Sequence, residues 1–205
     1  MRIAVINEVS ASQRNADIIT ALEGSSHTVY NAGMQNPEQK PELTYIHTGL
    51  MAAVLLNANA VDLVVGGCGT GQGFLNSAMQ YPGVFCGLIV DSLDAWLFTQ
   101  INGGNCISLP LNKGYGWAGD VNLGFVFEKL FACKAGAGYP EHRKESQKIS
   151  RETLGEISVN AHRSMDEILK TMNEEILTPI SQWDEFGRLL RESGDCGRNY
   201  SKYFE

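Results

Sequence analysis

The sequence predicts an α/β fold, in which one parallel sheet of five strands carries helices on both faces and a helical extension follows. Short β-branched segments alternate with helical spacing of apolar residues through about residue 132, as in parallel sheets with crossover helices. The segment 61–65 reads as a strand buried on both faces. In the last 60 or so residues the alternation stops and only helical spacing remains.

Five segments have the length and composition of strands, and two of them end in polar or glycine-rich residues. Ligands of parallel sheets bind outside the carboxyl ends of the strands, so we expect the candidate residues near strand ends to share that edge. The predicted strands are 2–6, 27–30, 61–65, 84–90 and 106–111. The residues expected at the edge are Asn7, Glu8, Cys68 to Gly73, Asp91 and the segment 102–105.

Helices connect these strands, and several have start signals. Ser10, Ser12 and Ser92 are candidate N-caps. The helix over 45–57 is strongly apolar, which indicates burial. The predicted helices are 12–23, 45–57, 74–80, 93–101 and 117–132. The apolar side of the last of them is predicted to carry Val121, Phe125, Leu130 and Phe131.

The remainder of the chain is charged and helical. Thr178-Pro179 reads as an N-cap followed by proline at the first helical position, and it predicts a helix that runs to about Arg191. The sequence therefore predicts an α/β domain over residues 1–149 and a helical extension over residues 150–205. We expect the extension to pack on the domain or on a partner subunit.

Composition limits the classes of function. The 205 residues carry a net charge of −7, which argues against a general nucleic-acid binder or a membrane-surface protein. No apolar run approaches the roughly 18 residues needed to span a bilayer. The five cysteines are widely spaced and include no C-x-x-C pair, which favours reduced thiols and argues against a zinc site. We expect a cytoplasmic protein.

The segment 66–73 is the candidate site. Five glycines follow a buried strand and precede a helix, so the backbone is free to take positive φ and to turn its amides towards an anion or an oxyanion. Within this loop lie one thiol, Cys68, and one hydroxyl, Thr70. A proton next to a carbonyl moves when a base lies close to the carbon and donors point at the oxygen. A helix N-terminus favours the thiolate that would serve as this base.

The loop 67–73 resembles that of the ribose-5-phosphate isomerase B family, which includes galactose-6-phosphate isomerase. The resemblance runs over roughly residues 1–149 and includes Tyr45 and His47 upstream of the loop. It also includes Asn102 and Asn105, in a segment similar to the family's His-Asn-x-x-Asn stretch.

The resemblance implies a Rossmann-like three-layer sandwich, a homodimer with its site near the subunit interface, and aldose–ketose isomerisation without metal or cofactor. It assigns proton transfer between C1 and C2 to Cys68. It assigns the enediolate oxygen to Thr70 and to the amides of Gly69, Gly71, Gln72 and Gly73. Further candidates for substrate contact are Asn7, Glu8, Tyr45, Asn102 and Asn105, and candidates for phosphate are Arg143 and Lys144.

Three departures from the family pattern point to an altered substrate. Asn7-Glu8 stands where the family has Asp-His, and Ile101 stands where it has the histidine that opens the furanose ring. The phosphate-binding basic residues are reduced to His142-Arg143-Lys144, with glutamates on both sides. We therefore expect a substrate that is either shorter and already open-chain or lacks the usual phosphate.

The sequence thus predicts an isomerase of a sugar phosphate of the pentose or tetrose type, and it leaves alternatives open. One is a catalytically silent protein that binds a sugar or sugar phosphate on the same scaffold, which the missing histidine favours. A nucleotide-binding Rossmann enzyme is a weaker alternative, because the glycine loop follows the third strand and not the first. Each candidate side chain also has a structural interpretation: Thr70 as a helix cap, the asparagines as turn residues, and Arg143 and Lys144 as a solvated helix face.

Overall fold

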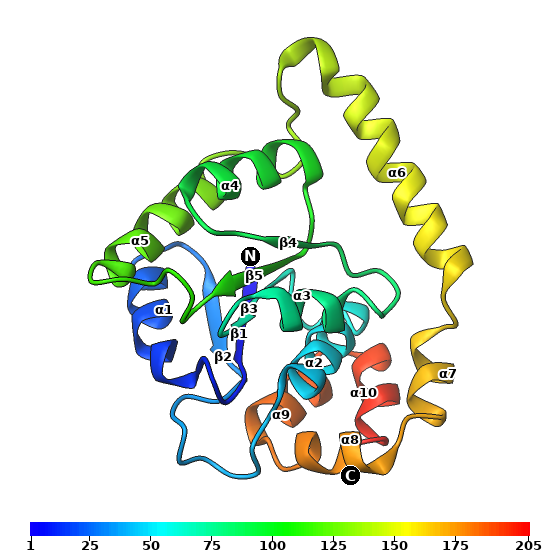
Figure 1. Ribbon diagram of the computed structural model, residues 1–205. Helices are drawn as coiled ribbons and strands as arrows, with labels where there is room; N and C mark the ends of the chain where they lie inside the picture. The colour runs from blue at the N-terminus through cyan, green and yellow to red at the C-terminus, as the bar shows by residue number, and fades with distance from the viewer.

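A computed structural model describes residues 1–205 and places five parallel strands in one sheet, in the order β2-β1-β3-β5-β4 (Figure 1). All four strand pairs are parallel. The strands are β1 (Arg2–Asn7), β2 (Thr28–Asn31), β3 (Leu63–Cys68), β4 (Cys86–Leu88) and β5 (Cys106–Pro110). The predicted sheet of five parallel strands is confirmed, although β4 is shorter than the predicted segment 84–90.

Helices cover both faces of the sheet because the central strands are apolar on both sides. In β1, Ile3 and Val5 point to one face, whereas Ala4 and Ile6 point to the other, and all four are fully buried. The first face carries α1 (Asn15–Leu22), α4 (Ser92–Leu97) and α5 (Gly119–Leu130). The second face carries α2 (Tyr45–Asn57) and α3 (Gln72–Ala78). Short segments lead into or out of helices: η1 (Ser12–Arg14), the π-helix η2 (Phe98–Asn102) and η3 (Glu141–Arg143).

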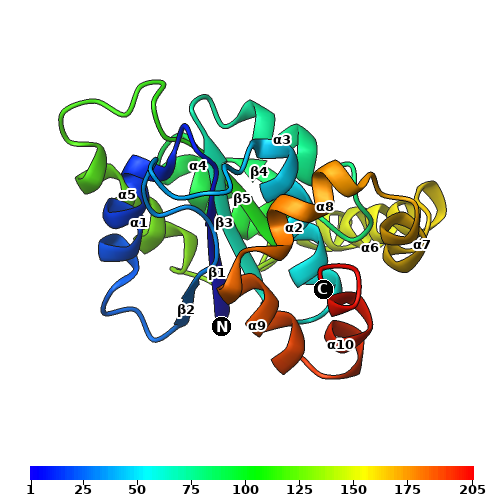
Figure 2. The ribbon, with the colours of Figure 1, turned by 90° about the horizontal axis from the view of Figure 1, so that it is seen from below.

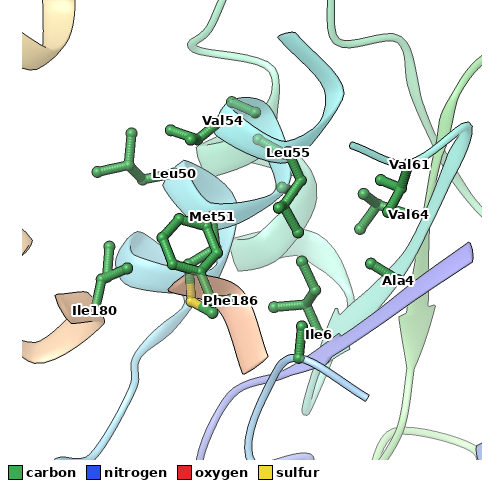
Figure 3. Close-up of a cluster of buried hydrophobic side chains, with 14 of the residues drawn as sticks. Ala4, Ile6, Leu50, Met51, Val54, Leu55, Val61, Val64, Ile180 and Phe186 are labelled. Atoms are coloured by element: carbon green, nitrogen blue, oxygen red, sulfur yellow. The ribbon is translucent and has the colours of Figure 1, made fainter. Parts of the chain in front are cut away.

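The extension forms five helices, and most of them pack against α2. They are α6 (Lys144–Ala161), α7 (Met165–Lys170), α8 (Glu174–Ser181), α9 (Asp184–Glu192) and α10 (Asp195–Ser201). Ile180 and Phe186, from α8 and α9, are fully buried against Leu50 and Met51 of α2 (Figure 3). Viewed from below, α2 lies between the sheet and this group of helices (Figure 2). This double burial explains why α2 is strongly apolar, as expected. No helix of the structure is both long and apolar enough to cross a membrane.

The helix α6 differs from the rest of the extension because it projects from the body of the molecule (Figure 1). The guanidinium of Arg151 ties it to the domain by donating to the carbonyl oxygens of Ile101 at 2.8 Å and Gly136 at 3.0 Å. The predicted domain boundary at 149/150 falls within this helix. Four of its apolar side chains are exposed: Ile149, Leu154, Ile157 and Val159.

The predicted helix start at Thr178-Pro179 is wrong. Asn173 caps α8 by accepting from the Glu175 N–H at 2.9 Å, so Pro179 lies inside the helix. Proline has no N–H to donate to the carbonyl of Glu175, four residues earlier. That carbonyl instead faces the ring of His47 on α2. The last helix, α10, follows Gly194 and was not predicted.

Three predicted N-caps are also corrected. Asp91, not Ser92, caps α4, because its carboxylate accepts from the N–H groups of Leu93 and Asp94, both at 2.9 Å. The Ser12 hydroxyl donates back to the carbonyl of Val9, and Ser10 takes part in the site described below. In α5 the buried side is Leu123, Val126, Phe127 and Leu130, whereas Val121 and Phe125 are exposed.

Candidate active site

The carboxyl ends of β1, β3 and β5 meet at one edge of the sheet. Asn7 at the end of β1 pairs with Gly67, and Cys68 at the end of β3 pairs with Pro110. Three loops leave from this edge: residues 8–11, the glycine loop 69–71, and residues 111–118. This geometry brings together segments that are about 60 and 40 residues apart along the chain.

The side chains of Cys68 and Thr70 lie next to each other. Cys68 is the last residue of β3 and is 6 % exposed, and its Sγ lies 3.9 Å from Oγ1 of Thr70. Thr70 Oγ1 accepts from the Gln72 N–H at 3.3 Å, so the hydroxyl caps the turn that leads into α3 and still has its own proton to donate. Gly71 has φ of 76° and leaves no room for a Cβ, which would lie 2.5 Å from Leu88 Cδ1. Glycine is therefore required at this turn.

The amides of the loop divide into occupied and free groups. The Gly69 N–H donates to Ser10 Oγ at 3.1 Å, and the Gly71 N–H donates to the carbonyl of Cys68 at 3.2 Å. The Gln72 N–H is held by Thr70. The N–H groups of Thr70, Gly73 and Phe74 have no acceptor in the chain. Of the amides in the predicted oxyanion nest, Gly69 to Gly73, only those of Thr70 and Gly73 are therefore without an acceptor in the chain.

Tyr45 lies against the glycine loop, and His47 supports the helix that carries it. A Cβ on Gly73 would lie 2.9 Å from the Tyr45 ring, which is itself 45 % exposed. His47 Nδ1 accepts from the Thr44 N–H at 2.9 Å and forms a capping box at the start of α2. Burial lowers the pKa of His47, while the carbonyl of Glu175 opposes this shift. His47 thus has a structural role at this helix end.

Glu8 is buried in the first loop, directly after Asn7, which is the buried last residue of β1 and pairs with the strand that carries the thiol. Asn7 Nδ2 donates to Asn15 Oδ1 at 2.9 Å, whereas Asn7 Oδ1 is buried and has no partner. Glu8 is 4 % exposed, and its Oε1 accepts from the hydroxyl of Ser10. A buried carboxylate with a single serine donor is unusual, because removing a charged group from water costs several kcal/mol, on the order of 5, unless partners offset it.

Three residues of this edge were missed by the sequence analysis: Ser10, Asn112 and Lys113. The N–H groups of Asn112 and Lys113 both donate to the carbonyl of Gly69, at 3.0 and 2.8 Å. Asn112 Nδ2 donates to the carbonyl of Ser10 at 2.7 Å. The place of Asn112 and Lys113 directly after a predicted strand was the signal that could have found them.

Asn102 and Asn105 precede β5 and lie at the other end of the sheet, so the prediction that segment 102–105 shares the edge with Cys68 is wrong. The carbonyl of Asn105 accepts from the N–H of Val64, four residues before Cys68, or roughly 13 Å along a strand. The reason is the direction of the strands. Segment 102–105 comes before β5 and lies at the amino ends of the parallel strands, whereas Cys68 lies at their carboxyl ends.

Asn105 and Asn102 differ in their contacts at this end. Asn105 Oδ1 accepts from Phe85 N–H at 2.9 Å and its Nδ2 donates to the carbonyl of Gly83 at 2.8 Å, so the side chain is occupied by backbone groups. Asn102 is exposed and lines, with Cys86 and Phe98, a hollow of about 290 Å³ beside β4. Arg143 and Lys144 are exposed on η3 and at the start of α6.

Comparison with known proteins identifies the family. The ribose/galactose isomerase family matches residues 3–119 of the chain. The ribose-5-phosphate isomerase from Vibrio parahaemolyticus is 38 % identical and covers 99 % of both chains, with a TM-score of 0.94. A 4-deoxy-L-threo-5-hexosulose-uronate ketol-isomerase, solved in complex with a tartrate, is 35 % identical and covers 99 % of this chain and 97 % of its own, with a TM-score of 0.92.

More distant structures share the fold alone. The type B ribose 5-phosphate isomerase from Trypanosoma cruzi is 18 % identical and covers 79 % of this chain and 100 % of its own, with a TM-score of 0.66. The comparison with curated proteins found no match. The matched residues include the whole glycine loop and the strands on either side of it. The chain belongs to the ribose/galactose isomerase family.

Proposed function

We propose that the chain is an aldose–ketose isomerase that acts on an open-chain sugar with an anionic end, and that Cys68 transfers the proton. One observation supports this most: the thiol at the end of β3 lies beside Thr70, in a loop whose Thr70 and Gly73 amides have no acceptor in the chain. A base at the carbon and donors at the adjacent oxygen are the two requirements of the reaction.

In the proposed mechanism one proton moves between neighbouring carbons. The Cys68 thiolate takes the proton from C2, the C–H electrons form a C1–C2 double bond, and the carbonyl electrons move to O1. The amides of Thr70 and Gly73 and the Thr70 hydroxyl stabilise the negative oxygen. The thiol then returns a proton to C1, while the hydroxyl proton of C2 passes to O1 and leaves a ketone at C2. The oxidation of C2 balances the reduction of C1, so the reaction needs no external oxidant or reductant.

The substrate class follows from the absence of a ring-opening group. Ile101 stands where the ribose-5-phosphate isomerase B pattern has the histidine that opens a furanose, and an isoleucine side chain cannot transfer a proton. The relative at 35 % identity is named for a 4-deoxy-5-keto uronate, a compound with no hydroxyl at C4 or C5 to close an ordinary sugar ring. We therefore propose an acyclic keto-uronate of this kind as substrate.

A pentose or tetrose phosphate is the second candidate. The relative at 38 % identity, which matches the chain over its whole length, is named a ribose-5-phosphate isomerase. A four-carbon sugar phosphate is also open-chain, because it has too few carbons to close a furanose through its phosphorylated terminus. In either case the substrate carries an anion, and the exposed Lys113, whose backbone N–H donates to the carbonyl of Gly69, is a candidate to bind it.

A second copy of the chain completes the proposed site. Asn102 lies in the segment before β5, at the end of the sheet away from Cys68, so within one chain it cannot bind a substrate held by that thiol. In a homodimer Asn102, Arg143 and Lys144 of the partner subunit are free to approach it. The exposed apolar side chains of the projecting helix α6 give such a dimer a surface to bury.

A catalytically silent sugar-binding protein is the rival from another class, since the ring-opening histidine is missing. The thiol beside the free amides of the glycine loop speaks against it, because binding alone needs no base at that position. Hydrogen exchange with solvent separates the two, because only an isomerase exchanges the hydrogen next to the carbonyl.

The test is proton NMR in heavy water with ribose 5-phosphate, erythrose 4-phosphate and 4-deoxy-L-threo-5-hexosulose uronate. We expect deuterium to enter next to the carbonyl of the open-chain substrates, Cys68→Ser to abolish this exchange, and Cys196→Ser, at an exposed cysteine of α10, to preserve it. Exchange that survives in Cys68→Ser assigns the base elsewhere. Ribose 5-phosphate turned over as fast as the open-chain compounds contradicts the substrate class. Binding without exchange makes the chain a sensor.

The proposed location is the cytoplasm. All five cysteines are free, and the proposed base is a thiol that must stay reduced to work. A reducing compartment meets that requirement. Fractionation of cells that express the chain tests this point.

A further inference from the structure

We infer that Glu8 and Ser10 are positioning residues, which hold the glycine loop in the orientation that aims the Cys68 thiol. The inference rests on the proposed function and deepens it. The contacts form a relay: the buried Glu8 carboxylate accepts from the Ser10 hydroxyl, and Ser10 Oγ accepts from the Gly69 N–H at 3.1 Å. We call this the Glu8–Ser10–Gly69 relay.

The proton count of the relay gives it a single direction. A serine hydroxyl has one proton to donate and can accept from another donor. Because the Gly69 N–H already donates to Ser10 Oγ, the hydroxyl proton must go to a different acceptor. The Glu8 carboxylate, which is 4 % exposed, is that acceptor. Glu8 therefore fixes the hydroxyl, and the hydroxyl fixes the Gly69 amide.

The relay sets the plane of the peptide between Cys68 and Gly69. In a trans peptide the N–H and the C=O point in opposite directions. With the Gly69 N–H held by Ser10, the Cys68 carbonyl points the other way, where it accepts from the N–H groups of Gly71 at 3.2 Å and Leu111 at 3.1 Å. The backbone of the residue that carries the thiol is thus held from both sides.

The peptide between Gly69 and Thr70 is held by the loop 111–118, and this orients the Thr70 N–H. The Gly69 carbonyl accepts from the amides of Asn112 and Lys113. The Thr70 N–H belongs to the same peptide plane and must point away from them, which leaves it without an acceptor in the chain. The Asn112 side chain also binds the Ser10 carbonyl at 2.7 Å, so the two supports of Gly69 are joined.

The relay also separates two roles for Glu8. As a proton acceptor from substrate, Glu8 would need its carboxylate, and Glu8→Gln would be as inactive as Glu8→Ala. As a positioning residue it needs only an oxygen that accepts from Ser10, which the amide Oε1 of glutamine supplies. Ser10→Thr likewise keeps the hydroxyl. Glu8→Gln therefore separates the two roles: it is inactive if Glu8 accepts a proton from substrate and active if Glu8 only positions Ser10.

The experiment measures kcat and KM for Glu8→Ala, Glu8→Gln, Ser10→Ala and Ser10→Thr, with Thr20→Ala on the exposed side of α1 as the control. We expect the two alanine variants at Glu8 and Ser10 to lose about 10- to 100-fold in kcat, as for a misplacement on the order of 1 Å, with KM nearly unchanged. Glu8→Gln, Ser10→Thr and Thr20→Ala stay close to wild type. Glu8→Gln as slow as Glu8→Ala, or Ser10→Ala at the wild-type rate, overturns the relay.

A second readout does not depend on isomerase activity. Alkylation of Cys68 by iodoacetamide, followed by peptide mass, should be faster in Ser10→Ala than in wild type because the loop is released. An unchanged alkylation rate overturns the relay even if no substrate is found, whereas faster alkylation in a chain that isomerises nothing contradicts only the proposed function. Ser10 is exposed, so its truncation leaves no cavity and the variant should fold even if Glu8→Ala does not.

Discussion

The two ends of the sheet hold polar side chains in opposite ways. At the carboxyl end, Glu8 and Ser10 bind each other and the glycine loop, the only hydrogen-bond partner of the Cys68 thiol is the Thr70 hydroxyl, and the Thr70 amide has no acceptor in the chain. At the amino end, Asn105 is bound to backbone groups and Asn102 is exposed. One chain therefore presents only part of the site that its sequence predicts.

This difference shows that residues that carry the same family resemblance can lie at opposite ends of one chain. The glycine loop acts within its own chain, whereas we expect Asn102 to act on substrate only as part of a dimer. Substitutions at the two ends test this division, from the largest expected effect to the smallest.

The largest effect is expected at the carboxyl end. Replacing Cys68 by serine removes the proposed base, so kcat should fall by about 10²- to 10⁴-fold, the range of general acid–base catalysis. The thiol lies at a strand end and is nearly isosteric with serine, so the midpoint of urea denaturation should stay close to that of wild type. A loss of activity matched by a loss of folded protein would place Cys68 with the structural residues instead.

The next prediction concerns Asn102 and the proposed dimer. Cys68→Ser and Asn102→Ala should each be nearly inactive alone, because each damages every site. After unfolding and refolding an equal mixture, half of the dimers are mixed and each has one intact site, so activity should return to roughly a quarter of wild type. Activity that stays at the level of the separate variants breaks the assignment of Asn102 to the partner's site.

Asn105 should behave in the opposite manner to Cys68. Asn105→Ala removes two hydrogen bonds to the Gly83–Phe85 turn and should lower the free energy of unfolding by about 1–3 kcal/mol. The kcat of the folded enzyme should change little. Urea denaturation and steady-state kinetics of one preparation measure both quantities. A large kcat loss at unchanged stability would instead give Asn105 a direct role in the site.

The smallest effect is expected for the ion pair at the amino end, in which Arg2 Nη2 lies 2.6 Å from Asp62 Oδ1. The hydrogen bond from Arg2 lowers the pKa of Asp62, against the opposing effect of partial burial. The pair therefore stabilises the fold above about pH 4, the unfolded pKa, and this contribution is lost as the pH falls through the lowered value. Because both side chains are 40 % or more exposed, it should be worth only about 0.2–1 kcal/mol.

The measurement for this pair is the unfolding free energy of wild type and Asp62→Asn at pH 7 and near pH 3. The difference between the two proteins should shrink at the lower pH, and high salt should reduce it at pH 7. A difference that grows on acidification would contradict a stabilising role for the ionised carboxylate. The kcat of Asp62→Asn should equal that of wild type at neutral pH.

Several details of the site could not be predicted because they depend on contacts between distant segments. Ser10 has the sequence signature of an N-cap, but its hydroxyl binds Glu8 and accepts from Gly69, 59 residues away. Pro179 has the signature of a helix start, but it lies inside α8 because Asn173 caps that helix first. In both cases the residue type fits the local rule, but contacts made by other residues decide its place in the structure.

By itself the sequence determined the parallel α/β fold, the glycine-rich segment with Cys68 after the third strand, and the resemblance to the isomerase family. These follow from local patterns: β-branched runs, helical spacing, and glycines at a turn where Gly71 needs a positive φ. Only the tertiary structure decided which amides stay free, that Glu8 and Ser10 support Gly69, and that Asn102 and Asn105 lie at the far end. Those facts depend on strand direction and on hydrogen bonds between loops, which no single segment of the chain encodes.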